Sequence, residues 1–224
     1  MKVTCISASN VRAKKNDSAS VKMCEQVGEL IKLEANQNVD VDILPLLDYE
    51  LSPCIMCGEC ADDNICIYDE DFNKILASLN ESDGVVLIAP LYASIPAKLI
   101  MLLEKLQELA YIRYVENDVK GTKEKFMLAD KPVAIIGHGG MPEDYDQIDV
   151  EQYYIDKLVK PLSDIIKSVQ MKVVPQNDER PNGLALGIKR MEKKEGKFFP
   201  EMVHDWESIS ERMKPLVANL IDRV

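Results

Sequence analysis

Residues 84–97 read Gly-Val-Val-Leu-Ile-Ala-Pro-Leu-Tyr-Ala-Ser-Ile-Pro-Ala. The first six form an apolar run that ends at a proline, which is typical of a buried strand. A short turn follows, and beyond Pro96 leucines recur at helical spacing. Pro96 suits the first turn of a helix, because the N–H that proline lacks has no partner there. This stretch therefore predicts a strand, a short turn and a long helix.

The same order of strand and helix recurs along the chain. Short apolar runs predict four further strands, at residues 2–7, 39–44, 133–136 and 171–174. Segments with apolar residues at helical spacing separate them, and Pro161 and Pro215 predict kinks in two of these helices. Strands that alternate with helices favour an α/β fold, a doubly wound five-stranded parallel sheet with helices on both faces.

The bulk properties of the chain limit its class. Its 224 residues and 46% hydrophobic content fit a single domain, residues 1–224, with an irregular, partly basic insertion at 175–204. A net charge of −11 argues against nucleic acid as a partner. No apolar run reaches membrane-spanning length, and residues 1–7 lack the features of a signal peptide. We therefore expect a cytoplasmic protein without membrane contact, in a compartment that keeps cysteines reduced.

Four of the six cysteines crowd one loop, which we place at residues 46–68. Thiols this close cannot pair as ordinary disulfides without severe strain, but they can surround one metal centre. The continuous run favours an Fe–S cluster over structural zinc, which usually uses two C-x2-C pairs around a longer insert. Zinc, a redox disulfide and unligated thiols stay open as alternatives. The pattern is C-x2-C-x2-C-x5-C, formed by Cys54, Cys57, Cys60 and Cys66.

The remaining cysteines, Cys5 and Cys24, fall on apolar positions of a predicted strand and helix. We expect both to pack in the core rather than to carry chemistry.

Polar side chains follow the first predicted strand. Ser7 and Ser9 come directly after it, and Asn16, Ser18 and Ser20 lead into the next helix. Hydroxyl and amide groups beside the N–H groups of a helix N-terminus suit a phosphate. An N-capped helix after a polar turn explains the same residues equally well. The loop is neither a Walker loop nor G-x-G-x-x-G, which disfavours ATP and a Rossmann-type NAD site.

Small residues follow the third and fourth predicted strands. Those after the third strand would let a flat ring approach the backbone, although a plain strand-to-helix turn explains them too: Pro90, Leu91, Tyr92, Ala93 and Ser94. Glycines after the fourth strand permit positive φ or close approach to a ligand, at Gly137, Gly139 and Gly140. His138 among them would donate to a ring or transfer a proton, or do nothing chemical. Since the ends of parallel strands meet, the three loops together predict a flavin mononucleotide (FMN) site.

A basic segment stands out in this acidic chain. It would attract a phosphate of NAD(P)H or an acidic electron carrier, or it is simply a solvated loop. Its members are Lys189, Arg190, Lys193, Lys194 and Lys197.

Over roughly residues 1–140 the chain resembles the flavodoxin-like NAD(P)H-dependent FMN reductases, and most closely their iron–sulfur flavoprotein branch. The likeness is carried by residues 6–9 with 18–20, by the cysteine motif from Pro53 to Cys66, and by residues 89–97. The sequence departs from the family at Ala8, where a glycine is usual. The resemblance implies a flavodoxin-like fold, noncovalent FMN, and a homo-oligomer, dimer or tetramer, with the flavin near a subunit interface.

These observations predict an FMN-dependent oxidoreductase or electron-transfer protein that couples FMN to a [4Fe–4S] cluster. NAD(P)H would be a donor and a small carrier such as a ferredoxin a partner, and no protein group need act as catalytic acid or base. The second interpretation is an NAD(P)H-dependent FMN or quinone reductase without a cluster. A third is a zinc-stabilised binding module with no enzymatic activity.

Overall fold

The structure is a computed structural model. It describes residues 1–11, 17–35, 37–92, 94–142, 148–192, 195–196 and 201–224, without the side chains of residues 190, 191, 201 and 202. Two of the predicted cofactor-binding residues, Asn16 and Ala93, lie outside the described residues, as does most of the basic segment.

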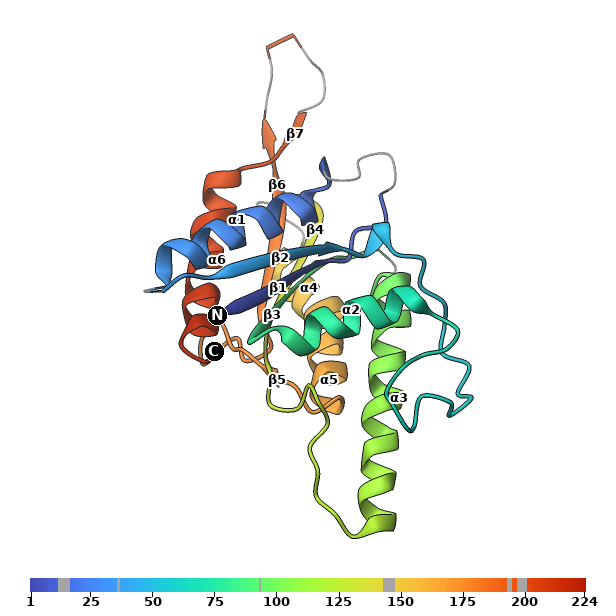
Figure 1. The fold of residues 1–224 in the computed structure, drawn as a ribbon. Coiled ribbons are helices and arrows are strands. Elements are labelled where there is room, and N and C mark those ends of the chain that lie inside the picture. The colour runs from blue at the N-terminus through green and yellow to red at the C-terminus, as the bar shows by residue number, and fades with distance from the viewer. Residues whose placement is uncertain (12–16, 36, 93, 143–147, 193–194, 197–200) are drawn as a thin grey trace.

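A parallel sheet forms the middle layer of the molecule (Figure 1). In spatial order its first four strands are β2 (Asp40–Pro45), β1 (Lys2–Ser7), β3 (Gly84–Pro90) and β4 (Pro132–Pro142). The register runs from Val85 opposite Val133 to Pro90 opposite His138 between β3 and β4. The carboxyl ends of β1, β3 and β4 therefore meet at one end of the sheet. The predicted parallel α/β sheet is confirmed.

Two strands share the fifth position of this sheet, on the same side of β4. The short β5 (Lys172–Val173) pairs with the start of β4, and β6 (Leu184–Glu192) pairs with its end. β6 then forms an antiparallel hairpin with β7 (Glu201–Val203). The prediction that 175–204 is irregular was therefore wrong over these strands. The apolar run from Leu184 to Ile188 completes the buried edge of the sheet.

The glycines of residues 137–140 lie within β4 and not in a loop after it. Gly137, His138 and Gly139 pair with Ala185, Leu186 and Gly187 of β6. The strand was predicted to end at Ile136, because these glycines were interpreted as a loop. The extended strand brings His138 to the same level of the sheet as Pro90.

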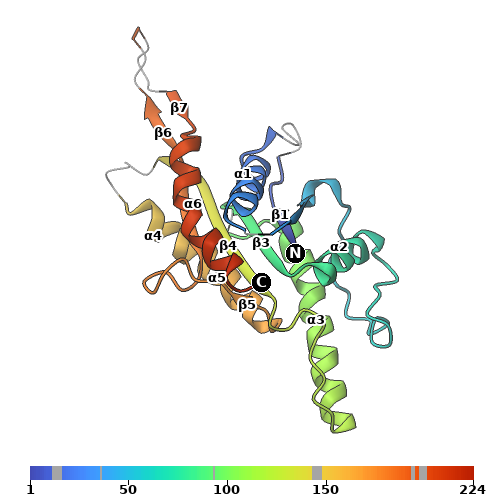
Figure 2. The same cartoon turned by 60° about the vertical axis from the view of Figure 1, so that its left-hand side comes forward.

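Helices cover both faces of the sheet (Figures 1 and 2). α1 (Ala19–Glu34) and α6 (Trp206–Ile221) bury their apolar sides against one face, with Cys5 and Cys24 in that core as predicted. The other face is covered by α2 (Glu70–Glu81), α3 (Ala97–Lys120), α4 (Val150–Tyr154) and α5 (Lys160–Ser168). Within the described part of the chain, no helix is long and apolar enough to cross a membrane.

The helical segment that contains Pro161 is irregular. Between α4 and α5 the chain forms a π-helical turn, η3 (Ile155–Val159), and Pro161 sits in the first turn of α5. Proline supplies no N–H to the preceding turn, and π-helical turns are a common response to such a break.

Candidate functional site

A cavity of about 600 Å³ opens where the carboxyl ends of β1, β3 and β4 meet. We call it the strand-end cavity. Ser7, Ser94 and Gly137 were predicted to bind a cofactor but lie outside its lining, whereas His138 is part of it. The lining includes the other described residues of the prediction: Ser9, Ser18, Ser20, Pro90, Leu91, Tyr92, Gly139 and Gly140.

One wall of the cavity is the N-terminus of α1. Ser18 is the N-cap, and its hydroxyl accepts a 3.3 Å hydrogen bond from the N–H of Val21. The first turn of a helix presents N–H groups without partners inside the helix, and its dipole favours negative charge. With Ser9 and Ser20 also in the lining, this wall suits a phosphate.

His138 joins this wall to the sheet. Its Nε2 lies 2.7 Å from the hydroxyl oxygen of Ser20 in the buried interior. Burial and, secondarily, the charge of His204 lower the pKa of His138 to about 3, so the imidazole is neutral near pH 7. Its Nδ1 is buried without a hydrogen-bond partner among the described residues, as is the hydroxyl of Ser7.

Tyr92 closes over the loop that follows β1. Its hydroxyl accepts a 3.3 Å hydrogen bond from the N–H of Asn10 and lies 3.5 Å from the hydroxyl oxygen of Ser9. The ring is about half exposed. Tyr92 therefore links the loops after β1 and β3 and forms a wall of the cavity at the same time.

None of the glycines of β4 adopts positive φ, and two of them, Gly137 and Gly139, are needed for packing instead. A Cβ on Gly139 would lie 2.2 Å from the ring of Tyr154, and one on Gly137 would lie 2.5 Å from Val159. Tyr154 is buried beneath the strand, and its hydroxyl accepts a 3.0 Å hydrogen bond from the N–H of Met141. Gly140 has space, since its Cβ would meet only the Lys189 side chain at 3.7 Å.

Residues from the unforeseen strand β6 and from the start of α6 complete the cavity. Lys189 of β6 borders Gly140, and His204 stacks on Trp206 with ring centroids 4.9 Å apart. The apolar alternation of Leu184, Leu186 and Ile188 was the sequence signal that would have placed a strand here.

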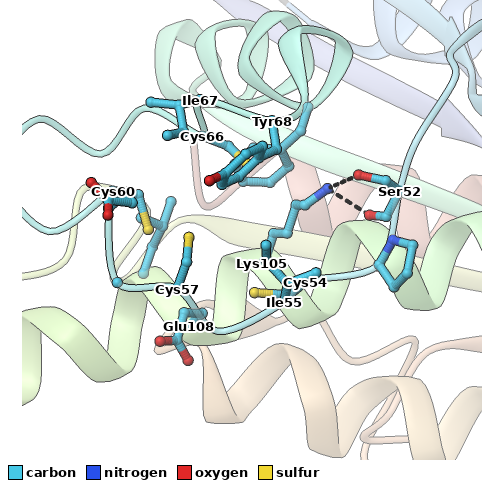
Figure 3. A pocket seen from close by; sticks show the side chains of 15 residues that line it. Ser52, Cys54, Ile55, Cys57, Cys60, Cys66, Ile67, Tyr68, Lys105 and Glu108 are labelled. Atoms are coloured by element: carbon cyan, nitrogen blue, oxygen red, sulfur yellow. Dashed lines mark hydrogen bonds between the residues drawn. The ribbon is translucent and has the colours of Figure 1, made fainter.

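A second, smaller cavity of about 130 Å³ lies between the cysteine loop and helices α2 and α3 (Figure 3). We call it the cysteine cavity. All four cysteines of the motif line it, together with Phe72, Leu109 and Lys105. The structure thus brings the four predicted metal ligands to one apolar-walled cavity.

The thiols differ in exposure, and the loop is tightly turned. Cys57 is exposed and the other three are intermediate, and partial burial raises the pKa of the Cys60 thiol. Met56 and Gly58 adopt positive φ, at 53° and 75°. Among the described residues, no three cysteine, histidine or acidic side chains converge closely enough to hold a metal ion. The donor set suits a thiolate-bound centre, but the sulfur positions do not form a closed ligand set.

Comparison with known families decides the assignment. Residues 1–153, about two thirds of the chain, match the family described as NADPH-dependent FMN reductase. The chain belongs to the NADPH-dependent FMN reductase family.

Two curated proteins resemble this FMN reductase family member over part of its length. It is 31% identical over 96 residues to an iron–sulfur flavoprotein of Methanocaldococcus jannaschii, covering 42% of this chain and 50% of that protein. It is 28% identical over 107 residues to an iron–sulfur flavoprotein of Methanosarcina thermophila, covering 47% and 52%. The chain thus matches about half the length of each relative.

Solved structures with the same fold cover the whole chain. An oxidoreductase from Corynebacterium diphtheriae aligns with a TM-score of 0.59 at 13% identity, covering 100% of this chain and 96% of that one. Flavodoxin 1 from Bacillus cereus aligns with a TM-score of 0.51 at 12% identity, covering 100% and 99%. These likenesses establish the flavodoxin-like fold of this FMN reductase family member.

The strand-end cavity fits the flavin named in the family description. Its volume lies in the usual range of cofactor sites, and the α1 N-terminus supplies an anion-binding wall. The buried, unpartnered Nδ1 of His138, a residue of the cavity lining, is a polar atom of the kind that a polar ligand satisfies.

Proposed function

We propose that this protein is an FMN-dependent oxidoreductase that couples FMN to a [4Fe–4S] cluster ligated by the four cysteines of the loop. The observation that carries the proposal is that all four cysteines line the cysteine cavity. The printed names of both curated relatives, iron–sulfur flavoproteins, support it. When bound, FMN exchanges two electrons and the cluster one at a time, so together they would link hydride chemistry to single-electron transfer.

The residues of the strand-end cavity would hold the flavin. Ser9, Ser18 and Ser20 would donate to the phosphate at the N-terminus of α1. The backbone of residues 90–92 and 139–140 would border the ring. Neutral His138 would orient Ser20 through their 2.7 Å contact, and no side chain of the cavity is assigned as an acid or base.

A plain NAD(P)H-dependent FMN or quinone reductase is the second candidate. One observation favours it: the described thiols do not form a closed ligand set. The zinc-stabilised, non-enzymatic module is disfavoured by membership of a reductase family.

We further propose NAD(P)H as electron donor and a small carrier such as a ferredoxin as partner. Lys189, in the lining of the strand-end cavity, would attract a phosphate of the donor. A homo-oligomer, dimer or tetramer, is supported by exposed apolar side chains near the free end of α3. These include Tyr114 and Val119, which are 65% and 80% exposed.

Anaerobic purification followed by an absorption spectrum and assays for iron, sulfide and FMN tests the proposal. Flavin bands with a reducible shoulder, iron and sulfide are expected. Flavin without iron after anaerobic reconstitution would establish the plain reductase instead. Failure to bind FMN on reconstitution would refute both candidates.

A further inference from the structure

Ser52, just before the first cysteine of the loop, is hydrogen-bonded to a buried ion pair. Lys105 of α3 and Asp69, the N-cap of α2, contact each other with side chains only 4% and 1% exposed. The Lys105 ammonium donates to the carbonyl oxygen and the hydroxyl of Ser52, at 2.5 and 3.1 Å. The Asp69 carboxylate accepts from the N–H and the hydroxyl of Ser52, at 2.9 and 3.1 Å. The peptide groups of Ser52 are thus held from both sides.

Cys66, the last cysteine of the loop, is held by a different side chain. The side-chain amide of Asn73 accepts from the N–H of Cys66 at 2.8 Å and donates to its carbonyl oxygen at 2.9 Å. Asn73 belongs to α2, so this contact fixes Cys66 to a regular helix. The two anchors are made by different side chains, and neither requires a metal ion.

Lys105 also reaches the cysteine cavity directly. Its side chain is part of the lining (Figure 3), and its ammonium lies 5.6 Å from the centre of the Phe72 ring. Cys54 follows Ser52 by only two residues. Hydrogen bonds that fix the backbone of Ser52 therefore restrict where the Cys54 thiol can lie. A buried ammonium and carboxylate hold each other strongly, because either group alone would be buried without a partner.

We propose that Lys105 is a positioning residue for the Cys54 thiol, acting with Asp69 through Ser52 whether or not a metal is bound. The inference rests on the proposed role of the four cysteines as ligands. A site that is partly ordered before loading loses less conformational freedom when the ligands close on a cluster.

The test measures cysteine reactivity in the metal-free protein under reducing, anaerobic conditions. Iodoacetamide labelling of the metal-free protein is followed for each cysteine by mass spectrometry. In Lys105→Met the labelling rate of Cys54 is expected to rise at least about tenfold, which corresponds to about 1.4 kcal/mol of lost local stability. The rate at Cys66 should stay within about twofold, because Asn73 still holds it.

Lys131→Met is the matched control. The Lys131 ammonium donates to the carbonyl oxygens of Leu79, Asn80 and Ser82 at the other end of α2, away from the cysteine loop. It should leave the labelling of both cysteines unchanged. If Lys105→Met does not fold, the double variant Lys105→Met/Asp69→Asn removes both charges and keeps an acceptor for the α2 cap.

Unchanged Cys54 labelling in a folded variant would overturn the inference, as would an equal rise at Cys54 and Cys66, which would indicate general loosening. Iron and sulfide uptake on reconstitution should fall severalfold in Lys105→Met and not in Lys131→Met. A wild-type protein that takes up no iron would refute the proposed cluster, while the labelling pattern would still decide the role of Lys105.

Discussion

The hydroxyl of Ser94 donates a 2.7 Å hydrogen bond to the backbone carbonyl of Lys157. In a regular α-helix that carbonyl would accept from the N–H of residue 161, but Pro161 has none. The turn after β3 therefore supplies a donor to the irregular helix that packs beside it. Ser94 does so in the left-handed region, with a φ of 88°.

Two substitutions of Ser94 distinguish the contribution of its hydrogen bond to stability from the cost of its positive φ. Ser94→Ala should lower the free energy of unfolding by about 1 kcal/mol, because the carbonyl loses its donor. Ser94→Gly should cost less, since glycine adopts positive φ without the penalty of a Cβ. Urea denaturation of the two variants measures the difference. Equal losses would show that strain at Ser94 is unimportant.

Gly139 and Gly140 line the strand-end cavity side by side, and substituting each tests whether packing against Tyr154 requires a glycine. Gly139→Ala should destabilise the protein by about 1–3 kcal/mol, because the added methyl overlaps the Tyr154 ring. FMN affinity should fall with it, as the strand moves off Tyr154. Gly140→Ala should leave the free energy of unfolding within about 0.5 kcal/mol, since the site is open. Thermal denaturation of the apoprotein compares the two, and similar losses would contradict this explanation.

The buried His138 predicts a pH dependence of stability. Its pKa is about 3 when folded and 6.5 ordinarily, so the unfolded chain binds more protons between these values. Stability from this residue is therefore complete above pH 6.5 and is lost as the pH falls toward 3, by up to about 1.4 kcal/mol per pH unit.

His138→Gln removes this titration and should flatten the slope of unfolding free energy between pH 6 and 4. His204→Gln, which removes the other histidine, should change that slope much less. Urea denaturation across the pH range gives both slopes. A wild-type slope retained in His138→Gln would mean that folding does not lower the pKa of His138.

Cys57 tests the metal assignment, because it is the most exposed cysteine of the motif. Cys57→Ser should abolish cluster absorption and lower iron content while FMN stays bound, since Cys57 lines the cysteine cavity and not the strand-end cavity. Cys24→Ala, a change in the core beneath α1, is the control and should keep its iron. Unchanged iron in Cys57→Ser would remove Cys57 from the ligand set.

The sequence predicted the elements whose signal is local. The apolar run at 84–89 and the leucine spacing after Pro96 depend on neighbouring residues alone, and both were found. β6 has a local signal too, the apolar alternation at Leu184, Leu186 and Ile188, but its place in the sheet is not local, because it continues the fifth position after an interruption of ten residues, 174–183. Nothing near Leu184 in the sequence reveals that β4 lies beside it.

The location of the candidate site could be predicted from the sequence, but the packing contacts and hydrogen bonds that hold its residues in place could not. The polar ends of β1 and β3 pointed to the strand-end cavity, and most of the predicted residues line it. The reason for Gly139 was hidden, because Tyr154 reaches it only through the packing of α4. Lys105 was assigned no role for the same reason: its partner Ser52 is 53 residues away in the chain.

α3 begins a few residues after Tyr92, which lines the strand-end cavity, and it carries Lys105 in its third turn, at the cysteine cavity. A helix of 24 residues is a stiff rod of about 36 Å. Any sliding of this rod along its axis would displace the side of the cysteine cavity that Lys105 and Leu109 form, and it would also shift the point at which the chain from Tyr92 enters the helix. The two cavities are therefore joined through α3, which walls the cysteine cavity and begins where the chain leaves the strand-end cavity.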